Sequence, residues 1–116
     1  MKIHRDPLDR LFSEYIRRRD GGICQRCGKY HGWKALDCSH YVKRRIKATR
    51  YDPDNCISLC FGCHQYFEEH REEYTQFMAD YIGEREFDLL LARSRNIGKL
   101  DVNGLLLYYR EKIKGI

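Results

Sequence analysis

The chain has 116 residues, of which 42% are hydrophobic and 34% charged, and its formal net charge is +5. This length corresponds to one domain with a small core. No run approaches the about 18 consecutive apolar residues that a membrane span needs, and the first residues lack the apolar segment of a secretory signal, so we expect a soluble protein of the cytoplasm.

The positive charge is concentrated in the first half of the chain. Residues 1–58 hold 14 Lys and Arg against 7 Asp and Glu, a net charge of +7, whereas residues 59–116 hold 8 against 10, a net charge of −2. The cations cluster at residues 17–19 and again within residues 43–50. Clustered cations attract polyanions through counterion release, and nucleic acid is the commonest of these partners.

The first predicted element is a helix over residues 6–20. Asp6 followed by Pro7 is typical of a helix start, with Asp as the N-cap and Pro in the first turn. The glycines at positions 21 and 22 are predicted to end this helix. Apolar residues recur along it with helical spacing and form one stripe, at Leu8, Leu11, Phe12, Tyr15 and Ile16.

Four of the six cysteines form two Cys-x-x-Cys pairs that are separated by 32 residues. Cys24 and Cys27 make the first pair, and Cys60 and Cys63 make the second. Four thiolates in two such pairs favour one tetrahedral Zn²⁺ ion in a structural site. Disulfides are not expected in an intracellular chain, whereas redox-active Cys-x-x-Cys pairs remain an alternative. Cys38 and Cys56 are expected to be core thiols without a chemical role.

Two short strands are predicted between the cysteine pairs, over residues 35–38 and 57–60. The segment between them, residues 41–55, contains the basic run and then the turn sequence Asp-Pro-Asp-Asn. The insert is therefore expected to form a hairpin with a basic loop.

Three helices are predicted after the second cysteine pair, over residues 63–81, 84–93 and 101–114. Gly83 separates the first two. The aromatic residues of the first helix fall mostly on one face, which indicates a core stripe more than a base-stacking surface. The apolar cluster at residues 105–109 is expected either to cap the core or to form an interface.

Two histidines and one asparagine lie at the ends of these elements. His40 follows the first strand, Asn55 closes the loop, and His64 comes directly after the last cysteine, in the first turn of a helix. A hairpin packed on that helix is expected to bring the three side chains together around one metal ion. A neutral imidazole, with a pKa of about 6.5, can take a proton from water, while a divalent cation neutralises a phosphodiester.

This arrangement resembles the HNH endonucleases, which have a ββα-metal fold. The segments that carry the resemblance are residues 36–45, 48–56 and 59–64, and they are closest to the phage recombination endonucleases of the NinG/Rap type. The resemblance covers roughly residues 8–93. It implies an α+β fold, with one HNH domain over residues 1–116. Its expected parts are an N-terminal helix (6–20), a ββα-metal core framed by a four-cysteine zinc site (24–81) and C-terminal flanking helices (84–116).

The resemblance assigns a role to each candidate residue. The histidine of the first motif is the general base in the family, and this role falls on His40. The helix-start histidine, His64, is a ligand of the catalytic metal, and Asn55 braces the hairpin and orients the base. Many HNH enzymes place a metal ligand immediately before the base, where this chain has Ser39. The nearest acid is Asp37, on the same side of the strand as Ser39, and it is expected to bind one Mg²⁺ or Mn²⁺ ion directly or through a water molecule.

The basic loop is expected to bind DNA. Arg50 is placed near the scissile phosphate, and the other loop cations should contact flanking phosphates, which position DNA without selecting a sequence. These other cations are Lys43, Arg44, Arg45 and Lys47.

The sequence therefore predicts a metal-dependent DNA endonuclease with weak sequence specificity. Resemblance to the NinG/Rap proteins implies branched recombination intermediates as substrates, and a homodimer that acts in the host cytoplasm. The alternative is a non-catalytic zinc module that binds DNA or RNA through the same loop. The two hypotheses differ at His40, which a binding module does not need.

Overall fold

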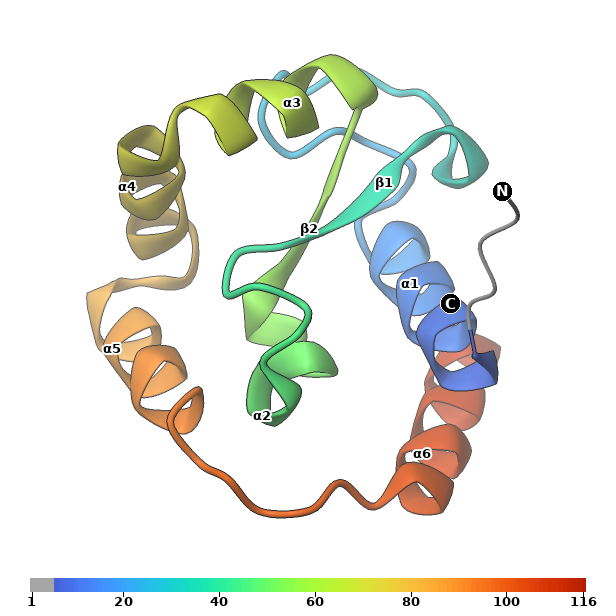
Figure 1. Cartoon of the computed structure of the whole chain (residues 1–116). Coiled ribbons are helices and arrows are strands. Elements are labelled where there is room, and N and C mark those ends of the chain that lie inside the picture. The colour runs from blue at the N-terminus through green and yellow to red at the C-terminus, as the bar shows by residue number, and fades with distance from the viewer. Residues whose placement is uncertain (1–5) are drawn as a thin grey trace, which may run out of the picture.

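The computed structural model describes residues 6–116 and has an α+β architecture. One two-stranded antiparallel hairpin lies at the centre, and helices surround it (Figure 1). None of the described helices is both long and apolar enough to cross a bilayer. The strands are β1 (Asp37–His40) and β2 (Cys56–Leu59), and the helices are α1 (Pro7–Arg19), α2 (Lys47–Arg50), α3 (Phe61–Glu69), α4 (Arg71–Ile82), α5 (Glu84–Arg93) and α6 (Val102–Lys114).

The predicted first helix is confirmed, and its N-terminal cap explains where it begins. The Asp6 carboxylate accepts a hydrogen bond from the backbone N–H of Asp9 at 2.8 Å, and Pro7 occupies the first turn. Gly21 and Gly22 follow the helix with φ of 68° and 74°, a conformation that favours glycine. The buried apolar stripe of α1 consists of Leu8, Phe12 and Ile16.

The two faces of the hairpin carry different side chains, and the strand register decides which. Asp37 pairs with Leu59, and His40, the last residue of β1, pairs with Cys56. Because successive residues of a strand point to opposite faces, Asp37 and His40 lie on opposite faces of β1. We name these the α1 face, formed by Cys38, His40, Cys56 and Ser58, and the α3 face, formed by Asp37, Ser39, Ile57 and Leu59.

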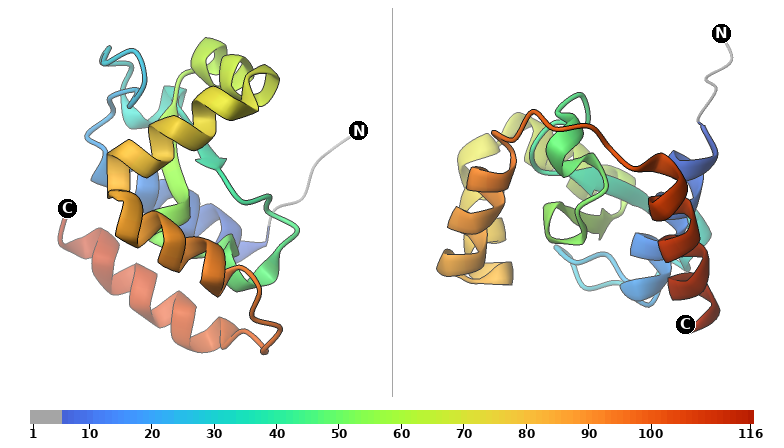
Figure 2. Two further views of the ribbon diagram at one scale, coloured as in Figure 1. Left: turned by 90° about the vertical axis from the view of Figure 1, so that its left-hand side faces the viewer. Right: turned by 90° about the horizontal axis from the view of Figure 1, so that it is seen from below.

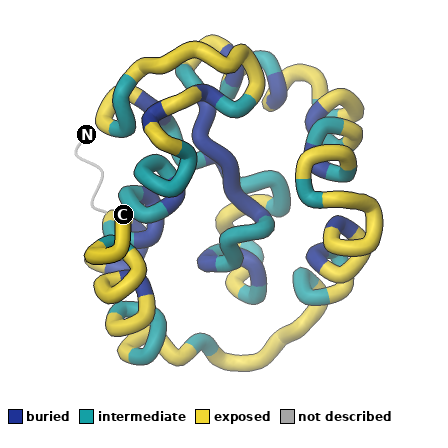
Figure 3. Tube along the Cα trace, turned by 180° about the vertical axis from the view of Figure 1, so that it is seen from behind, coloured by how far each residue is buried: buried dark blue, intermediate teal, exposed yellow. Residues whose placement is uncertain are grey.

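Each face of the hairpin packs against its own helices. On the α1 face, the Ser58 hydroxyl donates to the backbone carbonyl of Ile16 in α1 at 3.3 Å. On the α3 face, the Ser39 hydroxyl lies 2.7 Å from the hydroxyl of Tyr74 in α4. The core is thus divided into two clusters, and β2 is buried along its whole length between them (Figure 3).

The prediction of one helix over residues 63–81 was wrong, because this segment forms two helices, α3 and α4. His70 has φ of −127° and ψ of 67°, which is not helical. The break allows Phe67 of α3 to stack on Tyr74 of α4, with ring centroids 4.5 Å apart and an interplanar angle of 6°. Both rings are buried, so the bend lets two helices contribute aromatic side chains to the same core cluster.

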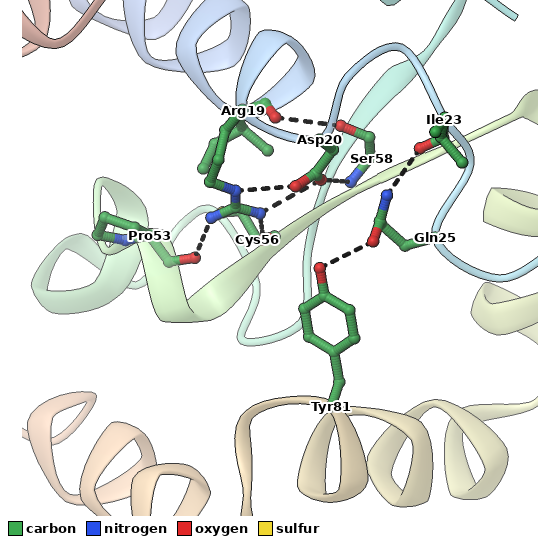
Figure 4. Close-up of polar contacts among 9 residues, drawn as sticks. Arg19, Asp20, Ile23, Gln25, Pro53, Cys56, Ser58 and Tyr81 are labelled. Carbon is green, nitrogen blue, oxygen red and sulfur yellow. Dashed lines mark hydrogen bonds and ion pairs between the residues drawn. The ribbon is translucent and has the colours of Figure 1, made fainter. Parts of the chain in front are cut away.

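Arg19 and Asp20 join the end of α1 to β2 (Figure 4). The Arg19 guanidinium donates to the carbonyl oxygens of Pro53 at 3.0 Å and Cys56 at 2.8 Å, and it pairs with the Asp20 carboxylate at 2.9 Å. The same carboxylate accepts a hydrogen bond from the backbone N–H of Ser58 at 2.9 Å. Arg19 belongs to a basic cluster that was expected to attract polyanions. In the structure its guanidinium holds the hairpin in place.

The last helix, α6, lies along α1, on the side of the hairpin opposite to α4 and α5 (Figures 1 and 2). Tyr109 of α6 is buried, and its hydroxyl donates to the backbone carbonyl of Tyr51 at 2.7 Å. Leu107 and Tyr108 remain 64% and 50% exposed. Residues 105–109 were expected either to cap the core or to form an interface. Tyr109 caps the core, whereas Leu107 and Tyr108 lie on the surface.

Candidate functional site

The predicted four-cysteine cluster is confirmed, and its geometry suits a structural zinc ion. The sulfur atoms of Cys24, Cys27, Cys60 and Cys63 all lie within 4.8 Å of one another. A tetrahedral Zn²⁺ ion with four bonds of about 2.3 Å holds its sulfur ligands about 3.8 Å apart, so these residues fit the ion. Gly28 closes the first turn with φ of 74°, and its N–H donates to the Cys24 carbonyl at 2.8 Å.

The pKa values of Cys24 and Cys63 are shifted in opposite directions. Burial opposes the ionisation of Cys24, but backbone N–H groups, including those of Cys27 and Cys60, point at its sulfur and lower its pKa to about 7. Burial raises the pKa of Cys63, and neighbouring thiols add to this effect although Arg26 donates to its sulfur at 3.4 Å. Four thiolates so close together repel one another, so a divalent cation is needed to hold them all deprotonated.

A carboxylate and an imidazole meet where β1 begins. Asp37 is the first residue of β1, and His64 lies in the first turn of α3, directly after Cys63. Nδ1 of His64 lies 3.1 Å from Oδ2 of Asp37, and the two side chains are 32% and 47% exposed. The structure thus brings together the two residues that were predicted to bind the catalytic metal. Both line an open cavity of about 410 Å³, which is also lined by Ser13, Arg17, Lys34, Leu36 and Cys38.

The two side chains form a hydrogen bond, because 3.1 Å between Nδ1 of His64 and Oδ2 of Asp37 is an ordinary N–H···O distance. Around an octahedral ion with bonds of about 2.1 Å, neighbouring ligand atoms are about 3.0 Å apart, so a divalent cation could replace the ring proton between the two atoms. Within residues 6–116 no third His, Cys, Asp or Glu completes a metal cluster at this point.

His40 lies at the other end of β1, on the α1 face. Its Nε2 donates to the backbone carbonyl of Arg50 at 2.9 Å, and its ring centroid is 6.0 Å from that of Phe12. Burial lowers the pKa of His40 below its ordinary value of 6.5, and the hydrogen bond to Arg50 opposes this shift only in part. The ring is therefore neutral at physiological pH. Because Nε2 carries the proton, Nδ1 holds the free lone pair.

The expected convergence of His40, Asn55 and His64 around one ion does not occur. His64 contacts Asp37 where β1 begins, whereas His40 ends β1 three residues later and faces α1. Three residues of strand, at about 3.3 Å each, correspond to about 10 Å. The prediction was wrong because the length of β1 and the alternation of its side chains separate the two histidines.

Asn55 holds the basic loop in shape. Its side chain is fully buried, and Oδ1 accepts a hydrogen bond from the backbone N–H of Val42 at 2.7 Å. Nδ2 donates to the backbone carbonyls of Val42 at 3.0 Å and Thr49 at 3.1 Å. Both ends of the amide are thus used on backbone groups, which places Asn55 as a brace for the loop and not as a metal ligand. Since Thr49 precedes Arg50, this brace also fixes the carbonyl that orients His40.

Most cations of the basic loop are paired within the chain. Nε of Arg50 donates to Oδ1 of Asp9 at 3.0 Å, and Arg44 reaches the same carboxylate at 3.4 Å. Lys43 pairs with Glu68 at 2.7 Å. Arg50, predicted to approach the scissile phosphate, is therefore neutralised by α1 in this structure.

Two loop cations remain available to a nucleic acid. Arg45 and Lys47 are exposed, and neither has an ion-pair partner in the described part of the chain. They are therefore the members of the predicted DNA-binding set that can contact phosphate without breaking an existing ion pair.

Asp9 is a residue of this region that the sequence analysis missed. Its side chain is 9% exposed, and it accepts hydrogen bonds from Arg50, from Arg44 and, at 2.9 Å, from the hydroxyl of Tyr51. Burial raises the pKa of Asp9, but its bonds to Arg50 and Tyr51 outweigh burial and hold the pKa below 3.8. The sequence does contain a signal for this role. Asp9 lies three residues before Phe12, which places it on the buried side of α1.

Comparison with known proteins covers the whole chain. The family model NinG, described as bacteriophage lambda NinG protein, matches residues 1–116. No curated protein and no solved structure matches. The family match extends beyond residue 93, where the sequence resemblance ended, and thus includes α6.

Proposed function

The chain belongs to the NinG family, and from this premise we propose that it is a metal-dependent DNA endonuclease of the HNH type. The observation that carries the proposal is the contact between Asp37 and His64 beside an open cavity. A carboxylate and an imidazole in this position suit a divalent cation that also binds phosphate. The zinc cluster supports the pair, because His64 directly follows its ligand Cys63.

Asp37 and His64 would hold one Mg²⁺ or Mn²⁺ ion. When bound, this ion neutralises charge on the phosphate and on the leaving oxygen. Arg17 and Lys34 line the same cavity, so cationic side chains flank the place where a phosphate would lie. Contacts to phosphate do not read the base sequence. The proposed nuclease is therefore expected to have weak sequence specificity.

His40 would accept the proton of the attacking water. It is neutral, and its Nδ1 is free to act as a base. The DNA backbone would have to cross the unpaired edge of β1 to contact both His40 and the metal pair. The products would carry 5′-phosphate and 3′-hydroxyl ends.

The proposed substrates are branched recombination intermediates, cut by a homodimer. This part of the proposal rests on the resemblance to the NinG/Rap endonucleases. Arg45 and Lys47, the exposed loop cations, would contact the DNA arms. Cleavage of four-way-junction, flapped, single-stranded and linear DNA, compared at equal concentration, distinguishes a junction enzyme from a general HNH nuclease.

Nicking of supercoiled plasmid DNA tests the proposed activity. The wild type, loaded with one Zn²⁺ per chain for the four-cysteine cluster, is compared with His40→Ala and with Lys114→Ala, a surface control on α6, in the presence and absence of Mg²⁺ or Mn²⁺. We expect nicking by the wild type and the control, and a loss of about 10²- to 10⁴-fold in His40→Ala. Failure of the folded wild type to cut any of these DNAs in either metal would contradict the proposal.

A second candidate function is a non-catalytic zinc module that binds nucleic acid. The observation that favours it is the separation of His40 from Asp37 and His64, because a binding module needs no convergent catalytic groups. This alternative predicts salt-sensitive DNA binding of equal strength by wild type and His40→Ala, with no nicking by either protein.

A further inference from the structure

Three side chains on the α1 face form a second cluster of metal-binding groups, separate from the four cysteines. The sulfur atoms of Cys38 and Cys56 and a ring nitrogen of His40 all lie within 4.8 Å of one another. The hairpin register creates this cluster, because His40 lies directly opposite Cys56 and Cys38 lies two residues before His40 on the same face. Cys38 and Cys56 do belong to the core, as predicted, and the structure also places both thiols beside His40.

The chemistry of this cluster suits a thiophilic metal ion. Two thiolates and one imidazole are a known type of ligand set for Zn²⁺, with a water molecule in the fourth position. Nε2 of His40 already donates to the carbonyl of Arg50, which fixes the ring and leaves Nδ1 with the lone pair that a metal requires. Two thiolates also balance the charge of a divalent cation, so the ion adds no net charge to this partly buried place.

An ion can reach the cluster from the solvent. Cys56 is buried, but Cys38 is partly exposed and lines the cavity of about 410 Å³ that opens beside Asp37 and His64. Of the three proposed ligands only Cys38 lines this cavity, so an ion entering from the cavity would meet Cys38 first.

We propose that Cys38, His40 and Cys56 form a second metal site, which takes a thiophilic divalent ion such as Zn²⁺. The site differs from the Asp37–His64 pair in its ligands and in its face of the hairpin. One consequence rests on the proposed nuclease function. An ion at this site takes the lone pair of His40 that the nuclease would use, so Zn²⁺ would inhibit cleavage.

Cobalt binding to the full-length protein tests the site. The four-cysteine cluster is first filled with Zn²⁺, and Co²⁺ is then added while the thiolate-to-cobalt charge-transfer absorbance is recorded. This absorbance reports only ions bound to sulfur, and we expect it to saturate at one further ion per chain. Cys38→Ser should abolish it. Lys114→Ala, on α6 and outside both proposed metal sites, is the control and should retain it.

His40→Ala gives a second measurement, because it keeps both thiols. It should weaken Co²⁺ binding by at least about 100-fold, since loss of an outer-shell partner alone weakens metal binding about 10- to 100-fold. Absence of the charge-transfer absorbance in the folded wild type, or an unchanged absorbance in Cys38→Ser, would overturn the proposal. If Cys38→Ser does not fold, the His40→Ala titration decides whether the cobalt is bound at this site.

Metal binding is measured without DNA, so its result is independent of nuclease activity. A protein that cuts no DNA while only its four-cysteine cluster is filled, yet binds the second ion, would refute the proposed function and retain this site. A nuclease that binds no second ion would refute only the site.

Discussion

Nδ1 of His64 lies 3.1 Å from Oδ2 of Asp37, and this contact joins the first turn of α3 to the first residue of β1. Different interactions hold the two elements in place. β1 is fixed by its pairing with β2, whereas the start of α3 is fixed by Cys60 and Cys63 of the zinc cluster. The position of His64 therefore depends on the structural metal, although the metal is not proposed to take part in the chemistry.

Removal of zinc is expected to unfold the protein. Structural zinc sites contribute on the order of 10 kcal/mol to folding, which is comparable to the whole stability of a small domain. We expect a strong chelator, or the substitution Cys27→Ser, to abolish most of the helical circular dichroism signal. A chelated protein whose spectrum and thermal unfolding match those of the zinc-loaded protein would show that the four-cysteine cluster does not need the metal.

Asn55→Ala is expected to destabilise the fold strongly. The substitution removes three hydrogen bonds to buried or partly buried backbone groups of the loop. Leaving such groups without partners costs about 1–3 kcal/mol each, so a total loss of at least about 3 kcal/mol is expected in urea unfolding. Ser39→Ala loses one bond, to Tyr74, and serves as the comparison, with an expected loss of about 1 kcal/mol. Equal losses in the two variants would show that Asn55 is not the brace of the loop.

Acid stability is expected to depend on Asp9. Hydrogen bonds from Arg50 and Tyr51 outweigh burial and hold its folded-state pKa below the ordinary 3.8. The unfolded state then binds the proton more readily, so the contribution of Asp9 to stability is present above about pH 4 and is lost as the pH falls through the folded-state pKa. Urea unfolding of wild type and Asp9→Asn, from neutral to acid pH, should show a shallower acid decline in the variant. Parallel curves would contradict this assignment.

Arg45 and Lys47 are expected to carry most of the loop's contribution to DNA affinity. Each can contact phosphate without losing an ion pair, whereas Arg50 and Arg44 are held by Asp9. Arg45→Ala and Lys47→Ala should each weaken binding at low salt and reduce the slope of log affinity against log salt by about 1. Lys114→Ala should change neither quantity. Salt slopes equal to that of the wild type in both loop variants would place the DNA elsewhere.

The parts of the fold that depend on local signals could be predicted from the sequence. Asp6 and Pro7 mark the start of α1, and Gly83, with φ of 92°, separates α4 from α5. The spacing of the cysteine pairs predicts their cluster, because two short turns can each present two sulfurs to one ion. The break at His70 could not be predicted, since it depends on packing of Phe67 against Tyr74 across the bend.

The sequence suggests candidate residues for a site, but the distances between them come only from the structure. Alternation already places Asp37 and His40 on opposite sides of a strand, but only the register shows that they stand at opposite ends of β1. The partner of Arg50 is 41 residues away, and no local pattern connects it to Asp9. The cluster of His40 with two further cysteines likewise depends on pairing between strands.

A double-mutant cycle on metal-dependent nicking tests whether Asp37 and His64 hold one catalytic ion. Rates are measured for wild type, Asp37→Asn, His64→Ala and the double variant in Mn²⁺. If the two side chains hold one ion, each single substitution removes most of the activity and the double variant is little worse than the more damaging single. Full activity in either single variant, or losses that simply add, would contradict the assignment of this pair as the catalytic metal site.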